Sequence, residues 1–433
     1  MTSLLPELFE SLYKDLNTEQ HAAMKKLHSP GNVFITGSAG TGKSHLIKNY
    51  LKGTDPQCIP VLASTGAAAV LIGGRTFHSF FSLGIMEGGA EKTIERALKD
   101  KRALRRLKKA NAIVIDEISM LPGEVLQVAE RIASLARNNP DAWGGLKIIA
   151  VGDFAQLPPI NRFNQKKDWA FSNPVWEKTQ FDCIELKELM RVQNDQDSEF
   201  TLALHDLRLG KLSDRLRNLL DWRTMLSEDD DVKASILFAR KVDVERINNK
   251  KLAELSGETV QFETIYRGRD SAIKSLKKSA PIGESLKLKE GAFVMIRQND
   301  PRGAWVNGSL GHILNIKDDA LSIKLLSGGI AEINKSNFSQ LDAEGNEAAN
   351  AKNFPITLAW AVTIHKSQGA TLDKAVVSLR GLWEPGQAYV AVSRVRSSED
   401  LLISGWDEKS IIADPQVQNF HKSIQERQKE CQL

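Results

Sequence analysis

The chain has 433 residues, of which 42% are hydrophobic and 26% are charged, and its formal net charge is +4. This composition predicts a soluble globular protein of two to four domains and excludes a disordered chain. No uninterrupted apolar stretch is long enough to cross a bilayer, the acidic start does not resemble a signal peptide, and three widely spaced cysteines form no metal-ligand or disulfide pattern. We therefore expect a protein of a reducing compartment, and the small positive charge is only weak support for a polyanionic partner.

The first predicted elements surround a glycine-rich loop. Residues 33–36 form an apolar run without polar alternation, as expected of a strand buried on both faces of a parallel sheet, and residues 45–51 have a helical pattern. The sequence between them, Gly-Ser-Ala-Gly-Thr-Gly-Lys-Ser, is a complete phosphate-binding loop in the required strand–loop–helix order. The predicted nucleotide ligands in and beside this loop are Gly37, Ser38, Ala39, Gly40, Thr41, Gly42, Lys43, Ser44 and His45.

The chemistry of this loop fits ATP and Mg²⁺. Glycines let backbone N–H groups close around phosphate oxygens, and the helix N-terminus adds positive potential at the same point. We expect Lys43 to neutralise the β- and γ-phosphates and the hydroxyl of Ser44 to ligate Mg²⁺. ATP and Mg²⁺ are therefore the predicted cofactors.

Residues 101–109 form the densest basic stretch of the chain, with Leu104 and Leu107 interleaved. This pattern favours a helix with a solvated charged face. A phosphate-binding role for the stretch is the less favoured interpretation.

Two further apolar runs, residues 112–116 and 147–151, are followed by polar side chains. Asp116 is predicted to bind the water shell of Mg²⁺, and Glu117 to orient and deprotonate the attacking water. Next to a phosphate loop this interpretation is favoured over a solvated turn. Gln156 is predicted to sense the γ-phosphate, whereas Asp153 also fits a simple helix cap. The helical pattern of residues 124–137 completes an α/β layered domain.

The stretch 286–333 differs from the rest of the chain. Its short apolar runs are separated by tight turns such as Asn307-Gly308, which suggests a small antiparallel barrel. Residues 356–379 and 400–404 return to the α/β style. The barrel is therefore predicted to be an insertion within a second α/β domain.

A phosphate loop alone also fits a nucleotide kinase, a transporter ATPase or a GTPase. The Asn-Lys-x-Asp stretch that guanine specificity usually needs is absent from the sequence. A motor requires a second domain that sends arginine toward the nucleotide, and Arg191 and Arg394 are the candidates. A lone arginine is normally a surface residue, so both assignments depend on family resemblance.

From residue 16 to about residue 406 the chain resembles the petite-integration-frequency (PIF-type) DNA helicases of superfamily one. The matching segments occur in the family's order and are Leu16-Asn-Thr-Glu-Gln20, the phosphate loop, Ser64-Thr-Gly-Ala-Ala68, Thr76-Phe-His-Ser-Phe80, Asp116-Glu-Ile-Ser-Met-Leu121, the helix from Glu124, Gly152-Asp-Phe-Ala-Gln156, Trp305-Val-Asn-Gly308, Trp360 to Gly369 and Gln387 to Arg394. Many matches in a fixed order are more specific than any single one. The helix from Glu124 and the barrel favour this family over the RecD-like and phage Dda-like helicases.

The resemblance implies an ATP-dependent 5′-to-3′ helicase that moves along single-stranded DNA. It assigns catalysis to Lys43, Glu117, Gln156, Arg191 and Arg394, and further nucleotide contacts to Gln20 and Gly369. The DNA contacts that it implies are Ser64, Thr65, Phe77, His78, Ser79, Thr363, His365 and Lys366. The spacing of Phe77, Phe80 and Phe81 is more typical of a core than of base stacking.

The resemblance also predicts the domain organisation. Residues 1–72 and 106–184 are expected to form the first RecA-like lobe, and residues 73–105 a small wedge inserted in it. Residues 185–270 and 353–433 are expected to form the second RecA-like lobe, with an SH3-like β-barrel insertion at 271–352.

One departure from the family pattern is Val192, which follows Arg191 where a glutamine is usual, so the role of Gln193 is open.

The length predicts a compact bacterial or phage-type member, cytoplasmic and acting as a monomer. Its predicted partners are single-stranded and forked or partial duplex DNA, with G-quadruplex DNA and RNA–DNA hybrids as further candidates. A DNA-stimulated translocase without strand separation shares all motifs. A nucleotide-gated binding module without turnover is disfavoured, because Lys43 and Glu117 are both present.

Overall fold

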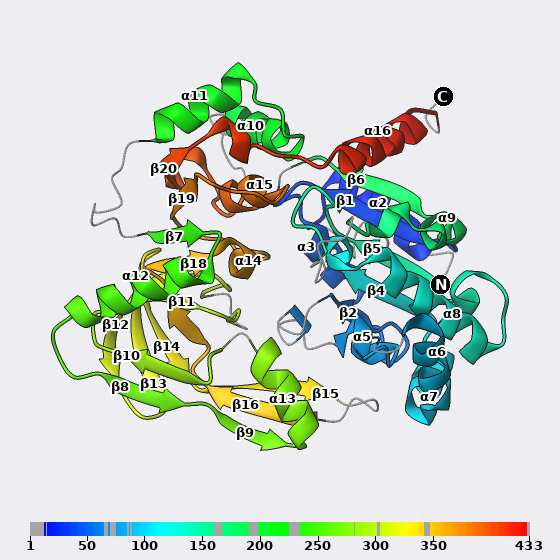
Figure 1. Ribbon diagram of the computed structural model, residues 1–433, viewed down its shortest axis with the longest axis horizontal. Helices are drawn as coiled ribbons and strands as arrows, with labels where there is room; N and C mark the ends of the chain where they lie inside the picture. Colours follow the sequence, from blue (N-terminus) through cyan, green and yellow to red (C-terminus); the bar gives the residue numbers. More distant parts are fainter. Residues whose placement is uncertain are drawn as a thin grey trace.

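The computed structural model describes residues 13, 15–64, 68–69, 75–84, 86, 89–159, 167–188, 190, 198–224, 234–280, 282–300, 304–341 and 347–430. They form two lobes, each built on a parallel sheet, and a unit of antiparallel sheets inserted in the second lobe (Figure 1). This confirms the predicted α/β fold class with two parallel-sheet lobes. The SH3-like form of the inserted unit stays a prediction.

The first lobe contains a six-stranded sheet in which every paired strand is parallel to its neighbour. In sheet order the strands are β3 (Arg75–Thr76), β2 (Val61–Ala63), β4 (Ala112–Asp116), β5 (Lys147–Val151), β1 (Val33–Gly37) and β6 (Asp182–Leu186). The apolar runs in β1, β4 and β5 are buried because helices cover both faces of the sheet. All the carboxyl ends consequently meet at one edge.

The helices of the first lobe are α2 (Thr18–His28), α3 (Lys43–Tyr50), α5 (Phe77–Phe80), α6 (Gly89–Lys99), α7 (Lys101–Lys109), α8 (Gly123–Arg137) and α9 (Pro174–Thr179). Helix α8 buries Val125, Ala129 and Ile132 at helical spacing and ends at Asn138, whose backbone is left-handed. Helices α6 and α7 pack against α8. The described part of the expected wedge, 73–105, thus continues the core of the lobe, and its role as a wedge stays a prediction.

The second lobe contains a four-stranded parallel sheet. In sheet order its strands are β18 (Ala361–Thr363), β7 (Ser235–Phe238), β19 (Ala375–Leu379) and β20 (Leu401–Trp406). The helices that accompany it are α10 (Ser198–Arg208), α11 (Asp214–Arg223), α12 (Lys241–Glu254), α14 (Ile364–Ser367) and α15 (Gln387–Val392).

The inserted unit has its own core, which includes Phe262, Val294 and Phe354. Its helix is α13 (Asp270–Ser279), and its antiparallel sheets are β14 (Ile330–Asn334), β13 (Ala320–Leu325), β12 (Leu310–Ile316), β11 (Phe293–Ile296) and β17 (Ile356–Leu358); β10 (Ser285–Leu288) and β8 (Val260–Glu263); and β15 (Ser336–Leu341), β16 (Glu347–Asn353) and β9 (Ile265–Gly268). Strands β8, β9 and β17 lie outside the expected range 271–352 but pair with strands inside it. This pairing favours an inserted unit that spans residues 260–358.

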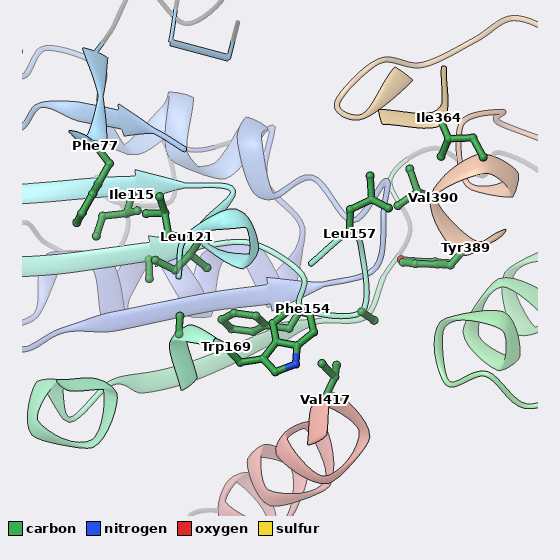
Figure 2. Close-up of a cluster of buried hydrophobic side chains, with 14 of the residues drawn as sticks. Phe77, Ile115, Leu121, Phe154, Leu157, Trp169, Ile364, Tyr389, Val390 and Val417 are labelled. Carbon is green, nitrogen blue, oxygen red and sulfur yellow. The ribbon is translucent and has the colours of Figure 1, made fainter. Parts of the chain in front are cut away.

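The last helix, α16 (Pro415–Glu430), follows the second lobe and packs against the first (Figure 1). The ring of Phe420 stacks on that of Phe171, with ring centroids 4.3 Å apart. One buried apolar cluster extends through both lobes, and Figure 2 shows Leu157 of the first lobe beside Val390 of the second. The lobes are thus joined by a shared core as well as by the chain. Within the described residues, every helix is too short or too polar to cross a membrane.

Candidate active site between the lobes

The phosphate-binding loop connects β1 to α3 at the carboxyl edge of the first sheet. Gly37 and Gly42 have positive φ angles of 146° and 81°. A Cβ atom at Gly37 would lie 2.4 Å from the carbonyl oxygen of Leu186, so the tight turn requires glycine there. The amino group of Lys43 donates hydrogen bonds to the loop carbonyls of Gly37 (2.8 Å) and Ser38 (2.9 Å). Burial lowers the pKa of Lys43, and Asp153 and Glu117 oppose this shift.

Gln20 is buried beside the loop. Its backbone N–H and its side-chain oxygen complete a reciprocal cap with Asn17 at the start of α2. Its amide nitrogen donates to the carbonyl of Thr41 at 3.4 Å. A Cβ atom at Gly42 would lie 2.3 Å from that nitrogen. The predicted adenine contact therefore lies against the loop, and Ser44 and His45 lie in the first turn of α3.

Asp116 and Glu117 lie at the end of β4, where the sequence predicts the metal and the water. Glu117 has a left-handed backbone, with φ 52° and ψ 47°. Burial and then the neighbouring Asp116 raise the pKa of Glu117 to about 7, and burial also raises the pKa of Asp116. A carboxyl group with this pKa exchanges protons near neutral pH, as a general base must.

Gln368 joins the two predicted catalytic groups of the first lobe. Its amide nitrogen, which belongs to the second lobe, lies 3.4 Å from Oε2 of Glu117 and 3.4 Å from Oε1 of Gln156. Sequence reasoning assigned no role to Gln368, although it stands directly before the predicted ligand Gly369. The side chain brings the second lobe to the atoms where water activation is predicted.

Tyr389 makes a second contact between the lobes. Its hydroxyl accepts a hydrogen bond from the backbone N–H of Ala39 (2.9 Å) and donates one to Oδ2 of Asp153 (3.1 Å). Burial raises the pKa of Tyr389, so the hydroxyl keeps its proton at neutral pH. The phosphate loop is thus hydrogen-bonded directly to helix α15.

Asp153 is at the centre of a buried charge network. Nη2 of Arg208 lies 3.1 Å from Oδ1 of Asp153, and Nη1 lies 3.1 Å from Oε1 of Glu185. Burial by itself would raise the pKa of Asp153, but the positive charges of Arg208 and Lys43 have the larger effect and lower it. Oδ1 of Asp153 also accepts a hydrogen bond from the backbone N–H of Ala155, but residues 154–159 form a turn and no helix, so the helix-cap interpretation is wrong. The ionised pair holds α10 against the phosphate-loop edge.

The two predicted arginine fingers differ in what the structure describes. Arg394 is buried, and its guanidinium donates to the carbonyl oxygens of Val390 (2.7 Å), Ser367 (3.3 Å) and Ala370 (3.4 Å). Its charge opposes, but does not cancel, the rise in the pKa of Glu117. Arg191 lies outside the described residues.

The predicted nucleic-acid contacts occur in two groups. In the first lobe, the hydroxyl of Thr76 caps the N–H of Ser79 at the start of α5, which also carries the half-buried His78. The hydroxyl of Ser64 is buried and has no hydrogen-bond partner within the described part of the chain, and Thr65 lies outside that part. In the second lobe, Thr363 caps α14, which carries His365 and Lys366.

The predicted contact by Phe77 is wrong. Its side chain is fully buried, and its ring packs on Phe81 with centroids 4.8 Å apart. Phe80 and Phe81 belong to the same core. These rings are therefore unavailable to stack on a base, because helix α5 turns them toward the sheet.

Two parallel-sheet lobes that share a phosphate loop, a carboxylate pair and an interlobe glutamine define a two-lobed P-loop nucleoside triphosphatase. A family model described as PIF1-like helicase matches residues 15–218. The ATP-dependent DNA helicase Pif1 of Bdellovibrio bacteriovorus is 49% identical, and the alignment covers 95% of this chain and 92% of that protein. The chain belongs to the PIF1-like helicase family.

Further relatives agree with this assignment. The ATP-dependent DNA helicase PIF1 of Xenopus laevis is 35% identical over 95% of this chain, which spans 64% of the length of that relative. The crystal structure of Bacteroides Pif1 with ADP-AlF4 matches with a TM-score of 0.82 at 27% identity, covering 95% of this chain and 97% of the other. The Bacteroides protein with ADP-AlF3 and single-stranded DNA matches with a TM-score of 0.65 over the same shares.

Proposed function

We propose that this protein is an ATP-driven helicase that moves 5′ to 3′ along single-stranded DNA and separates duplex strands. The observation that carries the proposal is the reach of Gln368 and Tyr389 from the second lobe to Glu117, Gln156 and the phosphate loop in the first. ATP bound to that loop would contact both lobes, so hydrolysis would change their separation. Membership of a family whose members are named ATP-dependent DNA helicases supports this activity.

In this proposal the chain's own residues divide the chemistry of hydrolysis. Lys43 neutralises phosphate charge, and Glu117 accepts the proton of the attacking water. Gln156 and Gln368 orient that water, while Arg394 and Arg191 stabilise the charge that develops on the γ-phosphoryl group. Carbonyl groups of its own lobe hold Arg394, so in this proposal the lobes close, or these hydrogen bonds break, before the guanidinium reaches phosphate.

The residues present fit a Mg²⁺ ion that is held mainly by phosphate and water. Within the described residues no group of three or more His, Cys, Asp or Glu side chains could hold a metal. Ser44 and Asp116 supply the oxygen donors that Mg²⁺ prefers, one hydroxyl and one carboxylate. The ion would supply charge neutralisation to the β- and γ-phosphates.

We further propose that the DNA strand contacts both lobes. His78 and Ser79 on α5 and His365 and Lys366 on α14 supply phosphate contacts that hold the strand without reading its sequence. If each lobe grips best at a different stage of the ATP cycle, every cycle moves the protein along the strand. Forked duplexes are the proposed natural substrates, G-quadruplex DNA and RNA–DNA hybrids are further candidates, and a monomer suffices.

A translocase that does not separate strands is the second candidate. It is favoured by the packing of α6 and α7, which continue the core of the first lobe where a wedge was expected. Strand displacement on a partial duplex with a 5′ tail distinguishes the two.

We expect displacement with the 5′ tail, no displacement with a 3′ tail, and loss of both displacement and ATP turnover in Lys43→Ala, because the loop then lacks its phosphate cation. ATP turnover stimulated by single-stranded DNA without displacement would favour the second candidate. An absence of DNA-stimulated turnover would contradict both.

A further inference from the structure

Among the described helices and strands, α7 has the largest excess of lysine and arginine over acidic residues. Its nine residues, Lys101–Lys109, contain six lysines and arginines and no acidic residue. Without this helix, the formal net charge of +4 would become −2 for the rest of the chain. The six cations of this helix thus exceed the net positive charge of the whole chain.

The helix presents two different faces. Ala103 and Leu107 are buried in the core of the first lobe. Lys101, Arg105 and Lys108 are exposed and, at i, i+4 and i+7, lie on one face over about 10 Å of helix. Among the described residues, no carboxylate lies within ion-pairing distance of these three side chains. By contrast, Lys109 lies 3.7 Å from a carboxylate oxygen of Asp55.

Helix α7 is fixed directly to the predicted strand-binding helix α5. Nε of Arg106 donates to the carbonyl of Phe80 (2.8 Å), and Nη2 donates to that of Ser79 (2.9 Å). The guanidinium also lies 5.6 Å from the centre of the Phe80 ring. Figure 1 shows α7 at the outer end of the first lobe, beyond α5 and α6. The helix that carries the cationic face is thus fixed to α5 through Arg106, which projects from another side of α7.

We propose that this face of α7 binds the phosphate backbone of the double-stranded segment that adjoins the single strand. The inference rests on the proposed function, because it extends the surface that would hold the strand on α5. Double-stranded DNA carries about one negative charge per 1.7 Å of its axis when both strands are counted, so roughly six charges lie along the roughly 10 Å of this face. A duplex beside the strand on α5 would present a row of phosphates that matches this row of cations.

The test compares two DNA probes across a range of salt concentrations. The triple variant Lys101→Gln, Arg105→Gln, Lys108→Gln removes the three charges. Glutamine is a good helix former, so α7 should stay folded when these exposed positions are changed. Equilibrium binding is measured by fluorescence anisotropy on a duplex with a 5′ single-stranded tail and on the tail sequence alone. We expect the slope of log affinity against log salt to fall by about 2 to 3 on the tailed duplex and to stay unchanged on the single strand.

A matched control is Arg246→Gln, Lys250→Gln, Lys251→Gln on α12, which removes the same charge from another surface helix. It should leave the difference between the two probes unchanged. If the slope of log affinity against log salt on the tailed duplex is the same for the α7 variant and the unaltered protein, the proposal is wrong. The cationic face would then be solvated or would bind an acidic protein. Equal losses on both probes would also overturn the proposal, because the cations would then serve the single strand.

The proposed function fails in a different way. ATP turnover stimulated by the single strand should be equal in the α7 variant and the unaltered protein. If neither protein shows stimulation, the proposed function is wrong, whatever the two binding slopes show.

Discussion

Glu117 combines the properties that a general base needs in a buried site. Its backbone is left-handed, which turns the residue away from the strand axis at the end of β4. Burial and the neighbouring Asp116 raise its pKa to about 7, and Gln368 contacts its carboxylate from the second lobe. The carboxyl group therefore changes its protonation state within the range in which the enzyme is expected to work.

We expect ATP turnover to fall as pH drops through about 7, because protonation removes the base, while ATP binding persists. Glu117→Gln should bind ATP and lose turnover by about 10²- to 10⁴-fold above pH 7, and this difference should shrink as pH falls below 7. The measurements are the pH dependence of kcat and the affinity for a fluorescent ATP analogue. Full turnover in Glu117→Gln would exclude Glu117 as the base.

Tyr389 is the residue whose single hydroxyl connects the phosphate loop to Asp153. Tyr389→Phe keeps the ring and removes only the hydroxyl, so Asp153 stays paired with Arg208. We expect DNA stimulation of ATP turnover to fall several-fold and unfolding free energy to fall by about 1 kcal/mol, because Ala39 loses its acceptor.

The control for this variant is Tyr13→Phe, in which the hydroxyl that is removed contacts His28 of the first lobe. Both effects are measured by steady-state ATP turnover with and without single-stranded DNA and by denaturant unfolding. If Tyr389→Phe retains full DNA stimulation, the hydroxyl does not couple the lobes.

At the scale of elements, α16 holds the end of the second lobe against the first. Phe420 stacks on Phe171, and the next residue, His421, lies 3.4 Å from Nη2 of Arg208. Burial and then Arg208 lower the pKa of His421 to about 4. The imidazole is therefore neutral at physiological pH, and a proton there would meet the positive charge of Arg208.

This depressed pKa predicts how the docking of α16 depends on pH. The unfolded chain binds a proton on His421 near pH 6.5 and the folded chain only near pH 4, so stability is lost as pH falls through that window. His421→Gln removes this titration. When the pH is lowered from 7 to 5, the unaltered protein should therefore lose more of its melting temperature than the variant does. A constant difference across that range would contradict the assignment.

At the scale of the whole molecule, the active site is completed only when the lobes meet. Gly386 of the second lobe allows this contact, because a Cβ atom there would lie 2.4 Å from the carbonyl oxygen of Gln156. The close backbone approach places α15 directly over the loop that carries Gln156 and Asp153. Movement of one lobe therefore acts at once on the predicted water and phosphate contacts.

We expect a non-hydrolysable ATP analogue to bring the lobes closer together. Fluorescent labels at Leu135 on α8 and Val242 on α12, both exposed, report the distance in a protein whose cysteines have been replaced. Energy transfer should rise with the analogue, and Lys43→Ala should abolish the change. The same transfer with and without nucleotide would contradict closure as the motor step.

The sequence alone determined the parts of the protein that depend on neighbouring residues. The phosphate loop needs only a strand, glycines and a helix start in succession, and the carboxylates at Asp116 and Glu117 follow a run that is apolar enough to be buried on both faces. The two-lobed α/β class followed from such runs. The family resemblance assigned Phe77 to DNA, whereas the spacing of the aromatic residues favoured a core, and the buried ring agrees with the spacing.

Only the tertiary structure decided which distant residues meet. Tyr389 and Ala39 are 350 positions apart, and Gln368 and Glu117 are 251 apart, so no local pattern of tyrosine or glutamine could pair them. The same holds for β8 and β9. The sequence placed them in the second lobe, whereas their hydrogen bonds to β10 and β16 place them in the inserted unit. Local spacing fixes the chemistry that each segment can offer, whereas the packing of two lobes and α16 fixes which groups share one site.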